Sequence, residues 1–218
     1  MPAEIATIDS GKPDSRLLRR AAGLIAAGEV LVCPTDTGYA FAANALDEGA
    51  IARVFRLKGR SFTNPVHVAV RSIEDAERYA EIDETARHIA EHFLPGALTM
   101  VLPRKEIVPD MLVAGLKTVG IRIPDNRVIL NLAGMTRLPL TTTSANISGR
   151  PTPYTVREII QQIGDNISDI SLILDQGTIC PAEVSTIVDL TVSPPRLLRQ
   201  GRIIWEEIQK VLQKEGIR

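Results

Sequence analysis

The sequence is poor in aromatic residues, which make up 4% of its 218 positions, so a hydrophobic core must be built from Leu, Ile, Val and Ala. No apolar run approaches the ~20 residues that a membrane-spanning helix needs. Residues 1–12 lack the apolar core of a signal peptide, so a cytoplasmic protein without membrane contact is expected. The formal net charge of −1 gives no overall field for a polyanion, and a large nucleic-acid footprint would need a local basic patch.

Cysteine is scarce and the familiar catalytic templates are absent. Cys33 and Cys180 have no metal-ligand spacing and no disulfide framework, and Cys33 is expected as a buried apolar residue in a strand. There is no GxxxxGKS/T, GxGxxG, HExxH or GxSxG motif. His88 and His92 are four residues apart on a predicted helix, but the sequence offers no clear third ligand. A solvated helix face is therefore favoured over a metal site, and no nucleophile-and-base mechanism is indicated.

What is present is enough hydrophobic sequence for one substantial core, since 44% of the residues are apolar. No internal repeat, low-complexity segment or Pro- or Gly-rich linker divides the chain. We expect one domain over residues 1–218, with a core at about 15–201 and a helical tail at 203–218.

Helices are predicted from hydrophobic periodicity and capping residues at residues 15–27, after Asp47, from Ser72 to Tyr79, after Asp83, and at residues 154–163 and 204–212. Strands are predicted at residues 30–33, 66–70, 98–102, 119–123, 138–142, 172–174 and 185–190. The two kinds of element alternate without a strict one-to-one rhythm, and helices are sparse between residues 98 and 123. This pattern indicates an α/β domain with a mixed sheet.

Polar residues lie at several strand ends, where α/β folds commonly place ligands. Residues 34–39 follow the first strand, although an ordinary turn is the favoured explanation of that segment alone. Lys58 and Arg60 lie at the end of a predicted helix, where they either complement the helix dipole or hold phosphate. Arg122 lies within an alternating strand, an unusual place for a charge unless it faces solvent or a site. Residues 141–146 are rich in hydroxyls, which suit either a polar ligand or a capped turn.

These segments gain meaning from their order along the chain. They are Pro-Thr-Asp-Thr, Lys-x-Arg, Pro-Gly-x-Leu-Thr (residues 95–99), Val-x-Ile-Arg-Ile-Pro, Thr-Ser-Ala-Asn-x-Ser-Gly, Ser-Thr-Ile-Val-Asp and Leu-Arg-x-Gly. In this order and approximate spacing, the sequence resembles the YrdC/Sua5 family of L-threonylcarbamoyladenylate synthases. The resemblance covers roughly residues 25–201. Without it, the residues indicate no more than an α/β ligand-binding enzyme.

The resemblance implies a twisted, open, mixed sheet with flanking helices and a large concave positive cavity. It implies formation of threonylcarbamoyl-adenylate from L-threonine, bicarbonate and ATP with release of pyrophosphate, for the t6A modification of tRNA. ATP with Mg²⁺ is the expected nucleotide substrate, and a downstream t6A transferase complex and tRNA are expected partners. The chain ends soon after Gly201, so it looks like the short, single-domain type of the family.

The resemblance also assigns site residues. Lys58 and Arg60 match the basic pair facing the nucleotide phosphates, and are the residues expected to carry catalysis. Residues expected near the amino acid are Thr35, His67, Arg122, Thr142 and Ser185, with Arg122 gripping the substrate carboxylate. Residues expected near the nucleotide, besides the basic pair, are Asn64, Thr118, Ser144, Asn146, Thr152 and Arg199. No residue is expected to bind a metal.

Two departures from the family pattern bear on the acceptor. Residues 40–42 are Ala-Phe-Ala where the family usually has Gly-Leu-Gly, and the bulk of Phe41 is expected to narrow the cavity. Many members have a histidine where this sequence, counted without gaps, has Ala69. His67 lies two residues earlier on the same strand face, and either replaces that histidine or is unrelated to it.

Three alternatives therefore stay open. The first is an RNA-binding module with a YrdC-like fold, which the near-neutral charge makes weaker. The second is a carbamoyl-adenylate-forming relative that acts on another acceptor. The third is a relative that kept the pocket and lost the activity.

Overall fold

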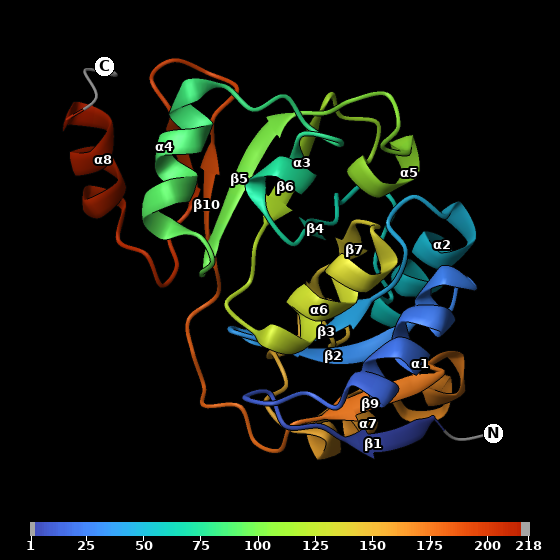
Figure 1. Cartoon of the computed structure of the whole chain (residues 1–218). Helices are drawn as coiled ribbons and strands as arrows, with labels where there is room; N and C mark the ends of the chain where they lie inside the picture. The colour runs from blue at the N-terminus through green and yellow to red at the C-terminus, as the bar shows by residue number, and fades with distance from the viewer. Residues whose placement is uncertain (1–2, 215–218) are drawn as a thin grey trace.

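The predicted strands are divided over two open sheets in the computed structural model, which describes residues 3–214 (Figure 1). One sheet is five-stranded, in the order β1-β9-β2-β3-β8, and the other is six-stranded, in the order β11-β10-β5-β6-β4-β7. Both contain parallel and antiparallel pairs, so the expected mixed α/β architecture is confirmed.

The strands are short, and their bounds are as follows. The five-stranded sheet contains β1 (Glu4–Thr7), β2 (Leu31–Thr35), β3 (Gly38–Ala42), β8 (Thr143–Ser144) and β9 (Leu172–Asp175). The six-stranded sheet contains β4 (Val68–Ala69), β5 (Leu98–Pro103), β6 (Thr118–Arg122), β7 (Leu140–Thr141), β10 (Thr186–Asp189) and β11 (Arg196–Arg199).

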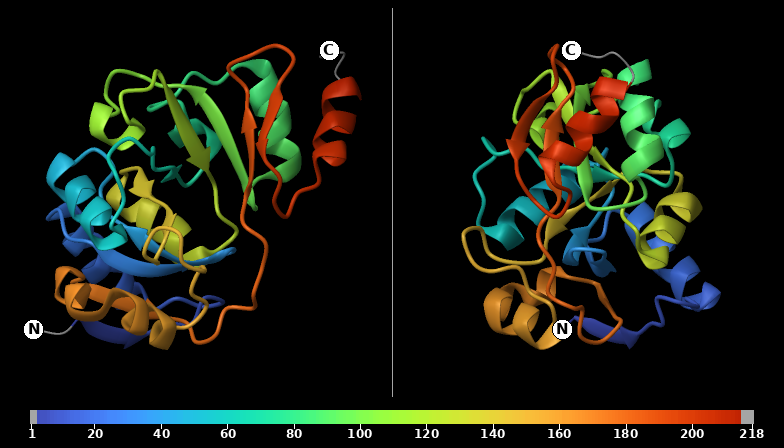
Figure 2. Two further views of the ribbon diagram at one scale, coloured as in Figure 1. Left: turned by 180° about the vertical axis from the view of Figure 1, so that it is seen from behind. Right: turned by 90° about the vertical axis from the view of Figure 1, so that its left-hand side faces the viewer.

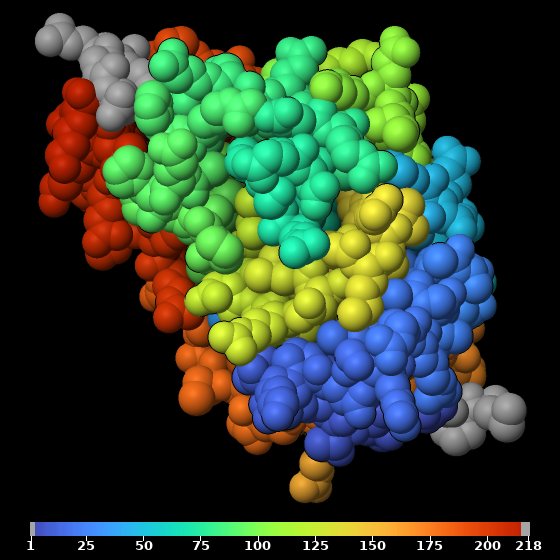
Figure 3. Space-filling view, viewed as in Figure 1, coloured from blue at the N-terminus to red at the C-terminus, as the bar shows by residue number. Residues whose placement is uncertain are grey.

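The helices pack on both sheets and join them. They are α1 (Ser15–Ala26), α2 (Glu48–Lys58), α3 (Ile73–Ala76), α4 (Glu84–Phe93), α5 (Asp110–Val113), α6 (Arg127–Thr136), α7 (Val156–Ile163), the 3-10 helix η1 (Gly164–Asp169) and α8 (Trp205–Lys214). Helices α1 and α6 pack together over β2 and form one side of the molecule (Figure 3). Helix α2 buries Ile51 and Phe55 in the core of the six-stranded sheet, and Val54 and Leu57 in a core on the five-stranded sheet.

Local sequence explains where several helices begin. The side chain of Asp47 accepts hydrogen bonds from the amides of Gly49 and Ala50, and Asp83 caps α4 through the amide of Ala86. Ser72 caps α3 as predicted, but this helix ends at Ala76 and not at Tyr79. These side chains satisfy amide groups that a helix leaves without backbone partners.

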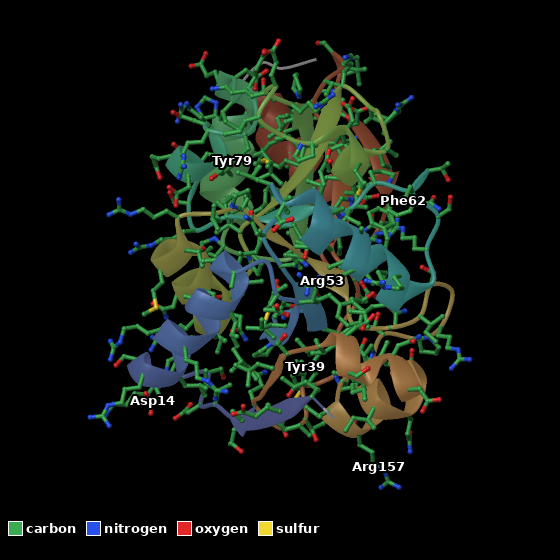
Figure 4. All side chains as sticks on the ribbon, turned by 90° about the vertical axis from the view of Figure 1, so that its right-hand side faces the viewer. Asp14, Tyr39, Arg53, Phe62, Tyr79 and Arg157 are labelled. Atoms are coloured by element: carbon green, nitrogen blue, oxygen red, sulfur yellow. The ribbon has the colours of Figure 1, made fainter. Side chains whose placement is uncertain are left out.

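Seven elements were not predicted from the sequence: β1, β3, β8, β11, α5, α6 and η1. Strand β3 is buried on both faces, so it shows no polar alternation. It forms a hairpin with β2, and Asp36 and Thr37 make the turn. Tyr39 of this strand, labelled in Figure 4, lies inside the molecule with 1% of its surface exposed.

The C-terminal part of the described chain lies against the six-stranded sheet. A long segment runs from β9 of one sheet to β10 of the other along the side of the molecule (Figure 2). Helix α8 follows β11 and packs on α4, and Trp205 contacts the core of the six-stranded sheet. Residues 215–218 of the expected helical tail lie outside the described residues. Across residues 3–214, no helix is long and apolar enough to cross a membrane.

Candidate active site

A cavity of about 640 Å³ lies where the two sheets meet. The run of residues 140–144 explains why it forms there. Leu140 and Thr141 pair with β4 of the six-stranded sheet, whereas Thr143 and Ser144 pair with β3 of the five-stranded sheet. The chain thus passes from one sheet to the other at Thr142, and the hydroxyl-rich run lines the cavity.

The cavity wall is cationic. Lys58, Arg60, Arg122 and Arg199 line it, and the described lining contains no Asp or Glu. Fixed positive charge in a partly enclosed site attracts and orients anions more strongly than the same charge in water. The arrangement is therefore suited to a polyanionic ligand.

Lys58 is 3% exposed, and its ammonium is held by the loop that follows β8. Its Nζ donates to the carbonyl oxygens of Ser144 and Asn146, at 2.6 and 3.1 Å, and to Oδ1 of Asn146, at 2.9 Å. Burial, with a smaller effect of Arg60, lowers the pKa of Lys58 to about 7. The three oxygen acceptors act against this shift, because a neutral amine has only two N–H groups to donate. Lys58 therefore fixes the loop at residues 144–146 while adding charge beneath it.

Arg122 reaches the cavity from the last position of β6. It is 5% exposed, and its NH2 group lies 3.0 Å from Oδ1 of Asp36 in the β2–β3 turn. Its NH1 group lies 3.3 Å from Oγ1 of Thr37 in the same turn. This explains why Arg122 occurs within a strand, which is an unusual place for a charge: its guanidinium faces the cavity and is paired with the buried carboxylate of Asp36.

Ser185 and Arg199 form a second polar pair at the edge of β10. The Arg199 guanidinium donates to the carbonyl oxygen of Ser185, at 2.8 and 3.1 Å, and to its hydroxyl, at 3.0 Å. The buried hydroxyl of Thr99 lies 2.9 Å from that of Ser185. Gly201 packs directly on this backbone, since a Cβ at that position would lie 2.2 Å from the carbonyl oxygen of Val184. Only glycine allows the approach that holds Ser185 in place.

His67 lines the cavity, whereas Ala69 is buried in a core cluster and does not. The imidazole lies over Gly120 of β6, where a Cβ would be 2.4 Å from its Cδ2. Burial and the guanidiniums of Arg199, Arg122 and Arg60 lower the pKa of His67 to about 3. The ring is therefore neutral near pH 7, and it can offer one N–H donor and one nitrogen acceptor to a ligand.

Thr142 carries a hydroxyl that is ready for a ligand. The residue is 6% exposed, and within the described chain its buried Oγ1 has no hydrogen-bond partner. Leaving a buried hydroxyl unpaired costs about 1–3 kcal/mol. Other hydroxyls in the wall already donate hydrogen bonds within the protein: that of Thr35 donates to the carbonyl oxygen of Gly38, and that of Ser144 donates to Oδ1 of Asn146.

Nearly all the residues that the sequence singled out come together. Those that line the cavity are Thr35, Lys58, Arg60, Asn64, His67, Arg122, Thr142, Ser144, Asn146, Thr152, Ser185 and Arg199. Thr118 does not line it, because it begins β6 and Arg122 ends that strand.

The expected effect of Phe41 is wrong. Its side chain points into a core cluster, is 0% exposed and does not line the cavity, so it does not narrow the space. Ala40 lines the cavity, since adjacent side chains of a strand point to opposite faces.

Two residues behind the wall, Asp36 and Thr99, were not identified as site residues from the sequence. Asp36 is far from Arg122 in sequence and touches it only because the β2–β3 turn and the end of β6 meet in space. Thr99 belongs to the Pro-Gly-x-Leu-Thr segment, which was the one signal available for it.

Comparisons with known proteins identify the family of this chain. A family model described as "Telomere recombination", covering Sua5, YciO and YrdC, matches residues 23–201. A protein of Pyrococcus abyssi named threonylcarbamoyl-AMP synthase is 42% identical over 196 residues, which are 89% of this chain and 57% of that protein. A protein of Methanocaldococcus jannaschii named putative threonylcarbamoyl-AMP synthase is 37% identical over 84% of both chains.

A solved structure gives the same result for the fold. The crystal structure of P. abyssi Sua5 complexed with L-threonine has a TM-score of 0.89 and 39% identity, over 95% of this chain and 60% of the other. This chain thus spans less than two thirds of that archaeal protein. With a family model matching most of its length and relatives above 35% identity, the chain belongs to the Sua5/YciO/YrdC family.

Proposed function

We propose that this chain forms L-threonylcarbamoyladenylate from L-threonine, bicarbonate and ATP, releasing pyrophosphate. The observation that carries the proposal is the cavity wall. Four cationic side chains and several hydroxyls converge on it, and the lining contains no carboxylate among the described residues. Such a wall suits a reaction in which two anions, a carbamate and a triphosphate, must be held together.

The chemistry needs no nucleophile from the protein. The amine of L-threonine and bicarbonate first form a carbamate with loss of water. A carbamate oxygen then forms a bond to the α-phosphorus of ATP, the bond from that phosphorus to the bridging oxygen breaks, and the electron pair leaves with pyrophosphate. Transfers of this type are catalysed mainly by positioning and by fixed positive charge. Mg²⁺ enters as part of the MgATP substrate. Within residues 3–214, no group of three or more His, Cys, Asp or Glu side chains could hold a metal ion.

The amino-acid end of the site is assigned to the part of the cavity around Arg122. Its guanidinium binds the substrate carboxylate as a planar fork. Thr35, His67, Thr142 and Ser185 surround the amino acid in this assignment, and the unpaired hydroxyl of Thr142 supports it.

The nucleotide end is assigned to the other cations. Arg60 and Arg199 face the phosphates, and Lys58 shapes the loop that carries Ser144 and Asn146. Asn64 and Thr152 complete the nucleotide contacts. Thr118 receives no role, because it lies outside the cavity lining.

The product is proposed to serve the t6A modification of tRNA in the cytoplasm. This places a t6A transferase complex downstream, and tRNA as the substrate of that later step. The whole chain is proposed to act as one YrdC-like domain, because residues of both sheets build the one cavity.

The test measures pyrophosphate release from MgATP and bicarbonate, with L-threonine, with L-serine and with neither. Release that requires L-threonine supports the proposal, and unchanged release after Lys58→Ala or Arg122→Ala contradicts the residue roles. Release with neither amino acid favours a related synthase with another acceptor. The position of His67, two residues before the family histidine, is the observation behind that second candidate.

A further inference from the structure

A buried ion pair stands behind the cavity wall. Asp36 lies in the β2–β3 turn, and its side chain is 7% exposed, whereas that of Arg122 is 6% exposed. Thr35 and Thr37, the neighbours of Asp36, line the cavity together with Arg122, but Asp36 does not. Asp36 borders a separate pocket with Asn126, so it contacts Arg122 from outside the cavity lining.

The contacts of Arg122 fix the plane of its guanidinium. One terminal nitrogen is held by Oδ1 of Asp36 at 3.0 Å and the other by Oγ1 of Thr37 at 3.3 Å. A guanidinium has five N–H groups, so the remaining ones stay available after these two contacts. Within residues 3–214, Nε of Arg122 and Oδ2 of Asp36 have no hydrogen-bond partner. Arg122 is thus anchored at two points and keeps an Nε that no described residue pairs with, as expected of a side chain that awaits a ligand.

Arg122 differs in this respect from the other cations of the cavity. Lys58, Arg60 and Arg199 donate to carbonyl, amide or hydroxyl oxygens, and in the described chain none of them forms an ion pair. A carboxylate beside Arg122 weakens the positive field of the cavity, so it opposes the binding of anions if charge alone is considered. Its presence is explained if orientation matters more than charge at this position.

We propose that Asp36 is a positioning residue, which holds the Arg122 fork so that its free N–H groups meet the carboxylate of the amino-acid substrate. This inference rests on the proposed function. The two physical effects of removing Asp36 have opposite signs. Loss of the negative charge would strengthen carboxylate binding, whereas loss of the anchor would weaken it, and misplacing a reacting group by about 1 Å can cost about 100-fold in rate.

The experiment compares Asp36→Ala and Asp36→Asn with the unchanged chain. The apparent KM for L-threonine and for MgATP is measured from pyrophosphate release, and the Kd for L-threonine is measured by calorimetry without nucleotide. We expect Asp36→Ala to raise the KM and Kd for L-threonine at least 10-fold, with the KM for MgATP within about 2-fold. Asp36→Asn keeps an oxygen acceptor for Arg122, so its KM and Kd for L-threonine should lie between those of the unchanged chain and of Asp36→Ala.

A matched control is Glu29→Gln, which removes the carboxylate of the half-buried Glu29–Arg53 pair outside the cavity lining. It should leave both constants unchanged. Unchanged or tighter L-threonine binding in both Asp36 variants would overturn the proposal, and so would an equal rise of both KM values, which a general loss of structure would give. If Asp36→Ala does not fold, Asp36→Asn decides.

The outcome for Asp36 is separable from that for the proposed function. A chain without threonine-dependent turnover would refute the proposed function, and the calorimetric comparison would then decide on Asp36. Failure of the unchanged chain to bind L-threonine at all would overturn both.

Discussion

The neutral His67 should make the stability of this protein depend on pH in a defined window. Burial and three guanidiniums lower the pKa of His67 from 6.5 to about 3. Between these values the unfolded chain binds a proton that the folded chain does not bind, so the unfolded state is favoured as the pH falls. The stability associated with the neutral ring is therefore present above about pH 6.5 and is lost progressively towards pH 3.

The size of the effect follows from the two pKa values. Between pH 7 and pH 4.5, a single histidine with these pKa values changes the free energy of unfolding by about 2–3 kcal/mol. The perturbation is His67→Gln, which removes the titrating group and keeps a polar side chain of similar reach over Gly120. The assay is urea unfolding of both proteins at pH 7 and at pH 4.5. The variant should lose about 2–3 kcal/mol less than the unchanged chain over this interval.

Carboxylates also titrate in this interval, but they do so in both proteins, so their contribution to the change in stability cancels in the comparison. His92→Gln is the matched control, because His92 is exposed on α4 and should behave like the unchanged chain. Equal losses in the unchanged chain and in His67→Gln would refute the reasoning, since they would mean that neither burial nor the cavity cations lower the pKa of this ring.

Two further substitutions test how the wall is held. Gly201→Ala places a Cβ against the backbone of residues 184–186, so we expect the free energy of unfolding to fall by about 1–3 kcal/mol, and pyrophosphate release to slow. The control is Gly23→Ala in α1, where an added Cβ meets no atom within 4 Å, and it should be neutral or stabilising by up to about 1 kcal/mol. A similar loss of stability in both variants would contradict this account. Lys58→Met keeps the length of the side chain but leaves three oxygens without their donor. We therefore expect the free energy of unfolding to fall by about 3 kcal/mol and pyrophosphate release to slow at least 10-fold. Lys210→Met on α8 is the control and should change neither quantity. A stable Lys58→Met variant with full activity would show that the loop at residues 144–146 does not need its anchor.

Much of the fold could be predicted because its local signals agree with its tertiary structure. Asp47 and Asp83 begin helices as their capping chemistry predicts, and β5 and β6 occupy the predicted runs. Strand β3 was missed because a strand buried on both faces shows no alternation. Helix α6 was missed although Asn126 caps it through the amide of Val128.

The site was predicted less evenly. The residues chosen from the ordered segments line the cavity, with the exception of Thr118. They could be chosen because the members of one family share this order of segments. The positions of Asp36 and Phe41 depend on how the hairpin of β2 and β3 meets its neighbours. Neither position can be read from a short window of sequence; Asp36, for example, pairs with a residue 86 positions away.

The passage of one short run from the six-stranded sheet to the five-stranded sheet at Thr142 has a consequence for the mechanics of the molecule. Because the cavity has one wall from each sheet, any rigid tilt of one sheet against the other changes its width. A ligand that spans Arg122 on one side and the loop at residues 144–146 on the other acts as a further crosslink between two layers that α2 and residues 140–144 already join. Amide hydrogens in β3 and β6, which belong to different sheets, should then open together when the cavity is filled and separately when it is not.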